Sequence, residues 1–131
     1  MEAKKSKFKF SNPVIKSSYF VVNEKFDKEK YSGLEIYCER EIKNQDQQKA
    51  QMDLKITVGK RTDEDPFFIE LVMSAWFQWE SDLQASIDDL LKTNDVALLI
   101  SYARPHIAYL TSNAGFKAYH LPYINVLESL E

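Results

Sequence analysis

The residue types that most often perform chemistry are few and scattered in this chain. There are two histidines, His106 and His120, far from each other in sequence, and a single cysteine, Cys38. A metal site needs clustered ligands, and a reactive thiolate needs a positive, partly exposed setting. Cys38 instead alternates with apolar residues, and Arg40 is the one positive charge on the same face of its expected strand. We therefore expect no metal site, and interpret both histidines and Cys38 as structural or surface residues.

Carboxylates and glycines give no stronger indication of an active site. Asp88 and Asp89 are neighbours on an expected helix, where adjacent side chains diverge, so a solvated helix face is the simpler interpretation. Phosphate-cradling loops need closely spaced glycines, whereas Gly33, Gly59 and Gly115 are far apart. The sequence therefore predicts neither an enzyme nor a cofactor.

Charge and length narrow the class of protein. The chain has 131 residues, 44% apolar and 28% charged, which is typical of one globular domain. Its first twelve residues hold four lysines and one glutamate, a net charge of +3, and the overall net charge of −3 therefore leaves −6 on the remainder. An acidic body does not suit a nucleic-acid backbone, so we expect no nucleic-acid partner. We expect residues 1–11 to form a flexible basic tail and residues 12–131 a single domain.

The sequence also predicts a cellular compartment. One cysteine excludes an intramolecular disulfide and is typical of a reducing environment. The N-terminal residues lack the apolar core of a secretory signal, and no apolar run approaches the ~18 residues of a membrane span. We expect a cytoplasmic protein without membrane insertion.

Hydrophobic alternation predicts four antiparallel strands in the first two thirds of the chain. In residues 50–58 every second side chain is apolar, the period of a half-buried strand. Residues 67–79 have one wholly apolar face and one mixed face, as expected for a central strand. Residues 34–42 and 13–26 supply the other two strands, and polar loops separate all four.

Helical spacing replaces this alternation after Ser81. Apolar residues in 81–92 recur at helical intervals, and a second apolar stripe begins near residues 93–95 and runs to Gly115. Pro105 interrupts the second helix at a cost of ~3 kcal/mol for a helix interior, yet the stripe keeps its spacing, so we expect one kinked helix. The predicted fold class is α+β, a four-stranded antiparallel sheet followed by a short and a long helix.

Aromatic side chains are the remaining signal. They make up 13% of the chain, and the segment after the second helix adds Phe116, Tyr119 and Tyr123 to those on the strands and loops. A domain of this size does not easily bury all of them, so we expect some to line an interface or groove. The alternative is a single well-filled core.

The C-terminal part of the chain resembles the protein-export chaperone SecB. The similar residues are Tyr102 to Arg104, Ile107, Leu110, Ser112 and Phe116, followed by Leu121, Pro122 and Asn125. The order of the expected elements also agrees with that family: four strands, a short helix, a long helix and an extended segment. The layout resembles SecB over most of the chain, whereas the motif lies within residues 102–125.

The resemblance implies a homotetrameric, ATP-independent holdase, a dimer of dimers that binds unfolded polypeptides in apolar grooves, with the SecA motor or an antitoxin as further partners. A groove of this kind needs apolar and aromatic walls. We expect the polypeptide-binding groove to include Phe26, Tyr31, Tyr37, Trp76, Phe116, Tyr119, Leu121 and Tyr123. We expect the oligomer interface to include Ile69, Leu71, Met73, Ala103, Ile107 and Leu110.

Departures from the family leave its role in export open. Glu70 falls where the family has an acidic residue that contacts the motor, but the family's acidic positions on the first strand are met here by Ser17 and Val21. Residues 122–131 do not resemble the family's additional C-terminal helix and acidic tail, and we expect the chain to lack them. Alternatives to an export holdase are a dedicated adaptor or antitoxin-guarding chaperone on the same fold and, ranked last, an enzyme or small-ligand binder.

Overall fold

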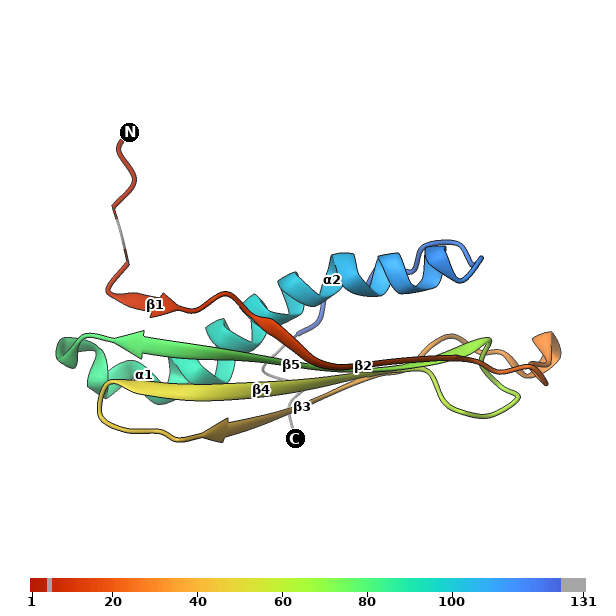
Figure 1. The fold of residues 1–131 in the computed structure, drawn as a ribbon, viewed down its shortest axis with the longest axis horizontal. Helices are drawn as coiled ribbons and strands as arrows, with labels where there is room; N and C mark the ends of the chain where they lie inside the picture. The colour runs from red at the N-terminus through yellow and green to blue at the C-terminus, as the bar shows by residue number, and fades with distance from the viewer. Residues whose placement is uncertain (5, 126–131) are drawn as a thin grey trace.

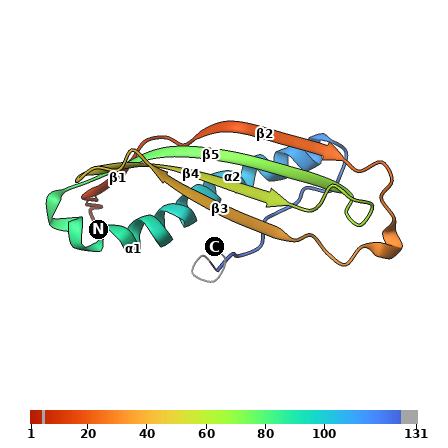
Figure 2. The same cartoon turned by 90° about the horizontal axis from the view of Figure 1, so that it is seen from below.

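The protein is described by a computed structural model that covers residues 1–4 and 6–125, without the side chains of residues 84–86, 89 and 92. A long antiparallel sheet is crossed on one face by one long helix (Figures 1 and 2). The strands are β1 (Phe8–Phe10), β2 (Val14–Val22), β3 (Ile36–Lys43), β4 (Lys49–Val58) and β5 (Phe67–Trp79). The end of the expected domain, residues 126–131, and the side chain of Asp89 lie outside the described residues.

The helical elements follow β5, except for one short turn. That turn, η1 (Lys28–Lys30), lies between β2 and β3. The elements after β5 are the 3₁₀ turn η2 (Ser81–Ser86), α1 (Ile87–Asp89), the π-helical turn η3 (Leu90–Asn94) and α2 (Asp95–Asn113). The fold class is therefore α+β, as the sequence predicts.

The sheet has five strands rather than four because its N-terminal strand is split. Both β1 and β2 pair with β5, and β4 then β3 follow on the other side of β5. Between β1 and β2 lies Pro13, which has no N–H to give to a ladder. Ser11 bridges the gap, since its N–H donates to the carbonyl of Trp76 and its hydroxyl accepts the N–H of Trp76, each at 2.9 Å. Residues 8–10, expected within a flexible tail, are thus part of the sheet.

The two central strands form the core, as their alternation predicts. On β4 the side chains of Ala50, Met52, Leu54, Ile56 and Val58 are all fully buried, and on β5 the alternate residues from Phe67 to Trp79 are at most 4% exposed. We call this side of the sheet the helix face. The intervening residues of the same strands point to the opposite side, which we call the open face.

One apolar stripe runs through the helical elements despite the changes of helix type. Its buried members are Ile87, Leu91, Val96, Leu99, Ile100, Ala103 and Ile107. Consecutive members are at most four residues apart, except Leu91 and Val96, which are five apart. The π-helical turn at Leu90–Asn94 accommodates the extra residue, because a wider turn keeps both side chains on one side. The expected boundary between two helices is therefore this wide turn.

Pro105 lies inside α2, which continues to Asn113. Next to the proline, His106 is tied to the sheet, with its Nε2 2.9 Å from the Ser18 hydroxyl on β2. Gly115 follows the helix with φ = +93°, a left-handed conformation that favours glycine and ends α2 where the sequence predicts.

Candidate functional site

Aromatic side chains converge at the end of the sheet where β2 finishes and β5 begins. The ring centroids of Phe67 and Phe116 are 5.2 Å apart, those of Phe20 and Phe116 6.2 Å, and those of Phe67 and Tyr119 6.3 Å. Near-perpendicular aromatic contacts of this kind are favourable because the edge of one ring meets the face of the next. Phe67 is buried and the other three are only partly so. We call these four residues the aromatic end.

A second aromatic pair lies beside the aromatic end. Phe26 and Tyr31 flank the turn η1 with centroids 5.8 Å apart. Burial raises the pKa of Tyr119, and the proximity of Tyr31 raises it further, so these two hydroxyls are neighbours. Four residues expected in the groove, Phe26, Tyr31, Phe116 and Tyr119, are therefore brought together.

The loop that carries Phe26 and Tyr31 is fixed by polar contacts. Asp27 caps the turn η1, since its carboxylate accepts the N–H of Glu29 at 3.0 Å. The N–H of Asp27 donates to the carbonyl of Asp63 at 2.8 Å, and the ammonium of Lys30 lies 2.5 Å from the Asp63 carboxylate. The loop is thereby attached to the turn before β5, which holds both rings beside the aromatic end.

The segment after α2 is attached to the helix at two points. The guanidinium of Arg104 donates to the carbonyl oxygens of Leu121 and, at 3.2 Å, of Pro122. The hydroxyl of Thr111 accepts the N–H of Tyr119 at 2.8 Å. The arginine and the leucine–proline pair of the SecB-like motif are therefore direct partners, and together they place residues 116–122 alongside α2.

The other residues expected in the groove lie elsewhere. Leu121 is 3% exposed and belongs to the core. Tyr37 is half-exposed near the same end of the sheet, but its pairing with Thr57 puts it on the open face. Tyr123 is 91% exposed beside a hollow of about 470 Å³ next to α2. Trp76 lies on the open face near the opposite end of β5. The structure therefore separates these four from the aromatic end.

The residues expected at the oligomer interface pack inside one chain. Ile69, Leu71, Met73, Ala103 and Ile107 belong to the hydrophobic core and are at most 3% exposed. Ile69, Leu71 and Met73 face the helix, as the sequence predicts, but in this arrangement all five residues have almost no accessible surface left for a second copy. Leu110 is partly buried and keeps some surface.

The open face is organised around one buried carboxylate, Asp53. A register shift between Ile15 and Ser17 lets Lys16 reach it, at 2.9 Å, and Lys43 approaches the same oxygen at 3.0 Å. Burial alone would raise the pKa of Asp53, but the Ser74 hydroxyl and the two ammonium groups favour the charged form and lower the pKa to about 2.

Glu70 also lies on the open face. It is only partly exposed, and its neighbours in the register are Tyr19 on β2 and Thr57 on β4. Of the residues that the sequence analysis aligns with the family's acidic positions, Ser17 pairs with Val72 and Val21 with Phe68 on β5. The side chains closest to Glu70 in the register therefore add no second carboxylate.

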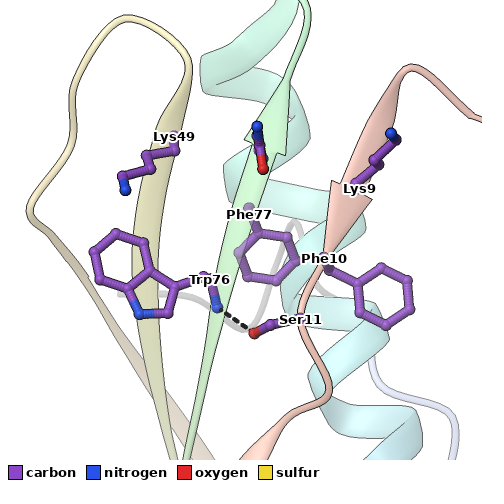
Figure 3. A pocket seen from close by; sticks show the side chains of 7 residues that line it. Lys9, Phe10, Ser11, Lys49, Trp76 and Phe77 are labelled. Carbon is purple, nitrogen blue, oxygen red and sulfur yellow. Dashed lines mark hydrogen bonds between the residues drawn. The ribbon is translucent and has the colours of Figure 1, made fainter.

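Trp76 borders a hollow of about 360 Å³ on the open face, close to β1 (Figure 3). The hollow is lined by Lys9, Phe10, Ser11, Lys49, Trp76, Phe77 and Gln78. The sequence analysis singled out Trp76 alone among these residues. The lysines were not predicted because their partners lie on strands distant in sequence, and only the register of β1 and β4 against β5 brings them together.

The cysteine and the histidines, residue types that often act in catalysis or metal binding, show no arrangement suited to either role among the described residues. Cys38 is 5% exposed, and burial raises the pKa of its thiol. His106 contacts Ser18, while His120 is exposed. Across residues 1–4 and 6–125, histidine, cysteine and acidic side chains form no group of three suited to a metal ion. Within the same residues, no helix has the length and apolar character needed to cross a bilayer.

Comparison with solved structures finds the same fold. The Rv1957 SecB-like chaperone of Mycobacterium tuberculosis, solved in complex with a ChAD peptide from the Rv1956 HigA1 antitoxin, matches with a TM-score of 0.62 at 14% identity over 90% of each chain. A protein of unknown function from Streptococcus agalactiae matches with a TM-score of 0.54 at 13% identity, over 88% of this chain and 97% of that one.

Sequence comparison extends this likeness to a family. The uncharacterized protein MJ0357 of Methanocaldococcus jannaschii is 30% identical over 126 residues, 93% of this chain and 81% of that protein. The model of the family described as preprotein translocase subunit SecB matches residues 10–128. That range begins in β1 and includes the sheet, α2 and the segment held by Arg104. The chain therefore belongs to the SecB family.

Proposed function

We propose that this chain is an ATP-independent chaperone that holds non-native polypeptide segments at its aromatic end. The observation that carries the proposal is the convergence of three partly buried rings, Phe20, Phe116 and Tyr119, with the partly buried Phe26 and the exposed Tyr31. Strand β2 carries Phe20, and hydrogen bonds fix the loop and the segment that carry the other four. Rigid aromatic surfaces bind apolar side chains with little loss of conformational entropy. Membership of the SecB family supports the same function.

The chaperone acts as a homotetramer, a dimer of dimers, in this proposal. The contacts are made by side chains that one chain leaves exposed, and not by the core residues that the sequence analysis chose. On β2, at the edge of the sheet, Val14 is 57% and Ile15 44% exposed. On α2, Tyr109 is 59% exposed. An exposed apolar edge strand readily pairs with another chain.

A dedicated partner is the second candidate. The Mycobacterium tuberculosis structure holds a peptide from an antitoxin on the same fold, and this motivates an antitoxin-guarding role for the present chain. Docking to the export motor is a further possibility that centres on Glu70, which lacks a second carboxylate among its nearest cross-strand neighbours. One dominant protein in a pull-down would favour the dedicated role over general holding of clients.

Aggregation of a chemically unfolded client, followed by light scattering, tests the proposed function. The wild-type chain is expected to suppress aggregation at a stoichiometric ratio. Tyr31→Ala is expected to raise the chaperone concentration needed for half-suppression by about fivefold, as for loss of one aromatic anchor. Tyr37→Ala is the matched control, because Tyr37 is similarly exposed, 51% against 44%, but lies on the open face. A wild-type chain that suppresses no client would disprove the proposal.

A further inference from the structure

The hollow beside Trp76 combines an aromatic surface with two cations from separate strands. Lys9 and Lys49 are both register partners of Gln78, one from each side. Their backbones are therefore two strand spacings apart, about 10 Å. The ammonium of Lys49 lies 5.1 Å from the centroid of the Trp76 ring, and the hydroxyl of Ser11 accepts the N–H of Trp76 (Figure 3). In Figure 3 the two side chains extend away from each other, so both lysines would turn toward Gln78 to contact one anionic group between them.

These two lysines differ from the other lysines of the strands. Lys16 and Lys43 are held by Asp53, and Lys55 lies 3.9 Å from a carboxylate oxygen of Glu39. Among the described residues, neither Lys9 nor Lys49 has a carboxylate within 4.0 Å of its ammonium. On a chain of net charge −3, the hollow is thus a local site of positive charge, of which the nearby Asp46 carboxylate offsets part at Lys49.

The remaining walls favour a ligand that is partly apolar. Trp76 is 39% exposed although it stands on a central strand, and its indole forms one side of the hollow. Such a surface suits an aromatic or aliphatic side chain, and the flanking ammonium groups suit a carboxylate next to it. Two lysines are too few to track a nucleic-acid backbone, which rewards extended rows of cations.

We infer that this hollow is a second polypeptide-binding site, selective for client segments in which an acidic residue adjoins a large apolar one. The inference rests on the proposed chaperone function, because the ligand is a client chain. It adds a charge preference that the aromatic end does not supply. Clients are then held at two places, at opposite ends and on opposite faces of the sheet.

Binding of paired peptides tests the charge preference. Two fluorescein-labelled peptides are identical except for a central Phe-Asp-Phe or Phe-Asn-Phe, and their affinities are measured by fluorescence anisotropy. The acidic peptide is expected to bind the wild-type chain about fivefold more tightly, since two exposed ion pairs contribute modestly. The difference should shrink when salt rises from about 50 mM to about 500 mM, because surface charges are then screened.

Variants separate the contributions of the charges and the indole. The double variant Lys9→Gln, Lys49→Gln should bind both peptides equally. Lys117→Gln, at an exposed lysine next to Phe116 of the aromatic end, should keep the preference. Trp76→Ala should weaken both peptides alike, because the indole contacts the shared apolar part. Far-ultraviolet circular dichroism establishes that each variant is folded.

Aggregation suppression measured in parallel distinguishes the two proposals. Suppression by the wild-type chain without a preference for the acidic peptide overturns the inference and leaves the chaperone function intact. A preference that survives in the lysine double variant, or a single-stranded oligonucleotide that displaces the peptide, also overturns it. If the wild-type chain neither binds the peptides nor suppresses aggregation, both the chaperone function and the second binding site are disproved.

Discussion

Two buried carboxyl groups show how strongly local surroundings determine charge. Asp53 is surrounded by two ammonium groups and a hydroxyl, and its pKa falls to about 2. Asp95, in the first turn of α2, is 1% exposed, and one of its carboxylate oxygens has no hydrogen-bond partner among the described residues. Burial raises the pKa of Asp95 from 3.8 to about 7. The sequence analysis identified neither residue, because both depend on contacts between distant segments.

Asp95→Asn is expected to stabilise the protein at neutral and higher pH. The folded chain keeps a proton on Asp95 that the unfolded chain releases above its ordinary pKa, so the wild type loses stability as the pH rises from 3.8 to about 7. The amide carries no charge and avoids this loss, on the order of 4 kcal/mol at full effect. Urea unfolding across that range measures it, with the exposed Asp88→Asn as control. An Asn variant that is less stable at pH about 8 would mean that the Asp95 carboxylate has a stabilising partner.

At the scale of elements, β1 tests the boundary of the folded domain. Phe8 stacks on Phe77 and Trp79 with centroids 5.8 and 6.2 Å apart, and all three residues of β1 pair with β5. Deletion of residues 1–11 should therefore lower the free energy of unfolding by on the order of 2 kcal/mol. Deletion of residues 1–4, which precede these contacts, is the control. Equal stability of the two truncated chains would support the flexible tail expected from the sequence.

The sequence predicts the long elements better than the short ones, for a physical reason. Alternation over nine or more residues leaves one arrangement for β4 and β5, because any slip of one residue would expose their apolar side. Strand β1 has three residues, too few for a pattern, and its pairing depends on a partner about seventy positions away in sequence. Likewise the π-helical turn at Leu90–Asn94 depends on tertiary packing, because the next apolar side chain must lie against the sheet.

At the scale of the whole molecule, exposed apolar side chains predict self-association. Light scattering is expected to give four times the mass of one chain, with a further increase on addition of an unfolded client. Ile15→Lys, which places a charge on the exposed edge of β2, should reduce the mass. Tyr37→Lys, an equally drastic change on the open face of β3, should leave it unaltered. A monomeric wild-type chain would exclude the tetramer.

The candidate site was predicted by residue type but not by position. Aromatic excess pointed to a groove, and four of the eight chosen residues do lie together. The other four are separated because residue type alone fixes neither the face of the sheet nor the end at which a side chain lies. Tyr37 lies near the aromatic end but on the open face, and Trp76 lies on the open face at the opposite end of β5.

Arg104 holds the segment after α2 through its backbone, and this determines which positions of that segment can be substituted. The guanidinium contacts carbonyl oxygens, which every residue possesses, and not the side chains of positions 121 and 122. The attachment is therefore indifferent to the identity of the exposed residues nearby. In the proposed chaperone, libraries that vary positions 120 and 123 are expected to change which client segments bind, while the scaffold beneath stays unchanged.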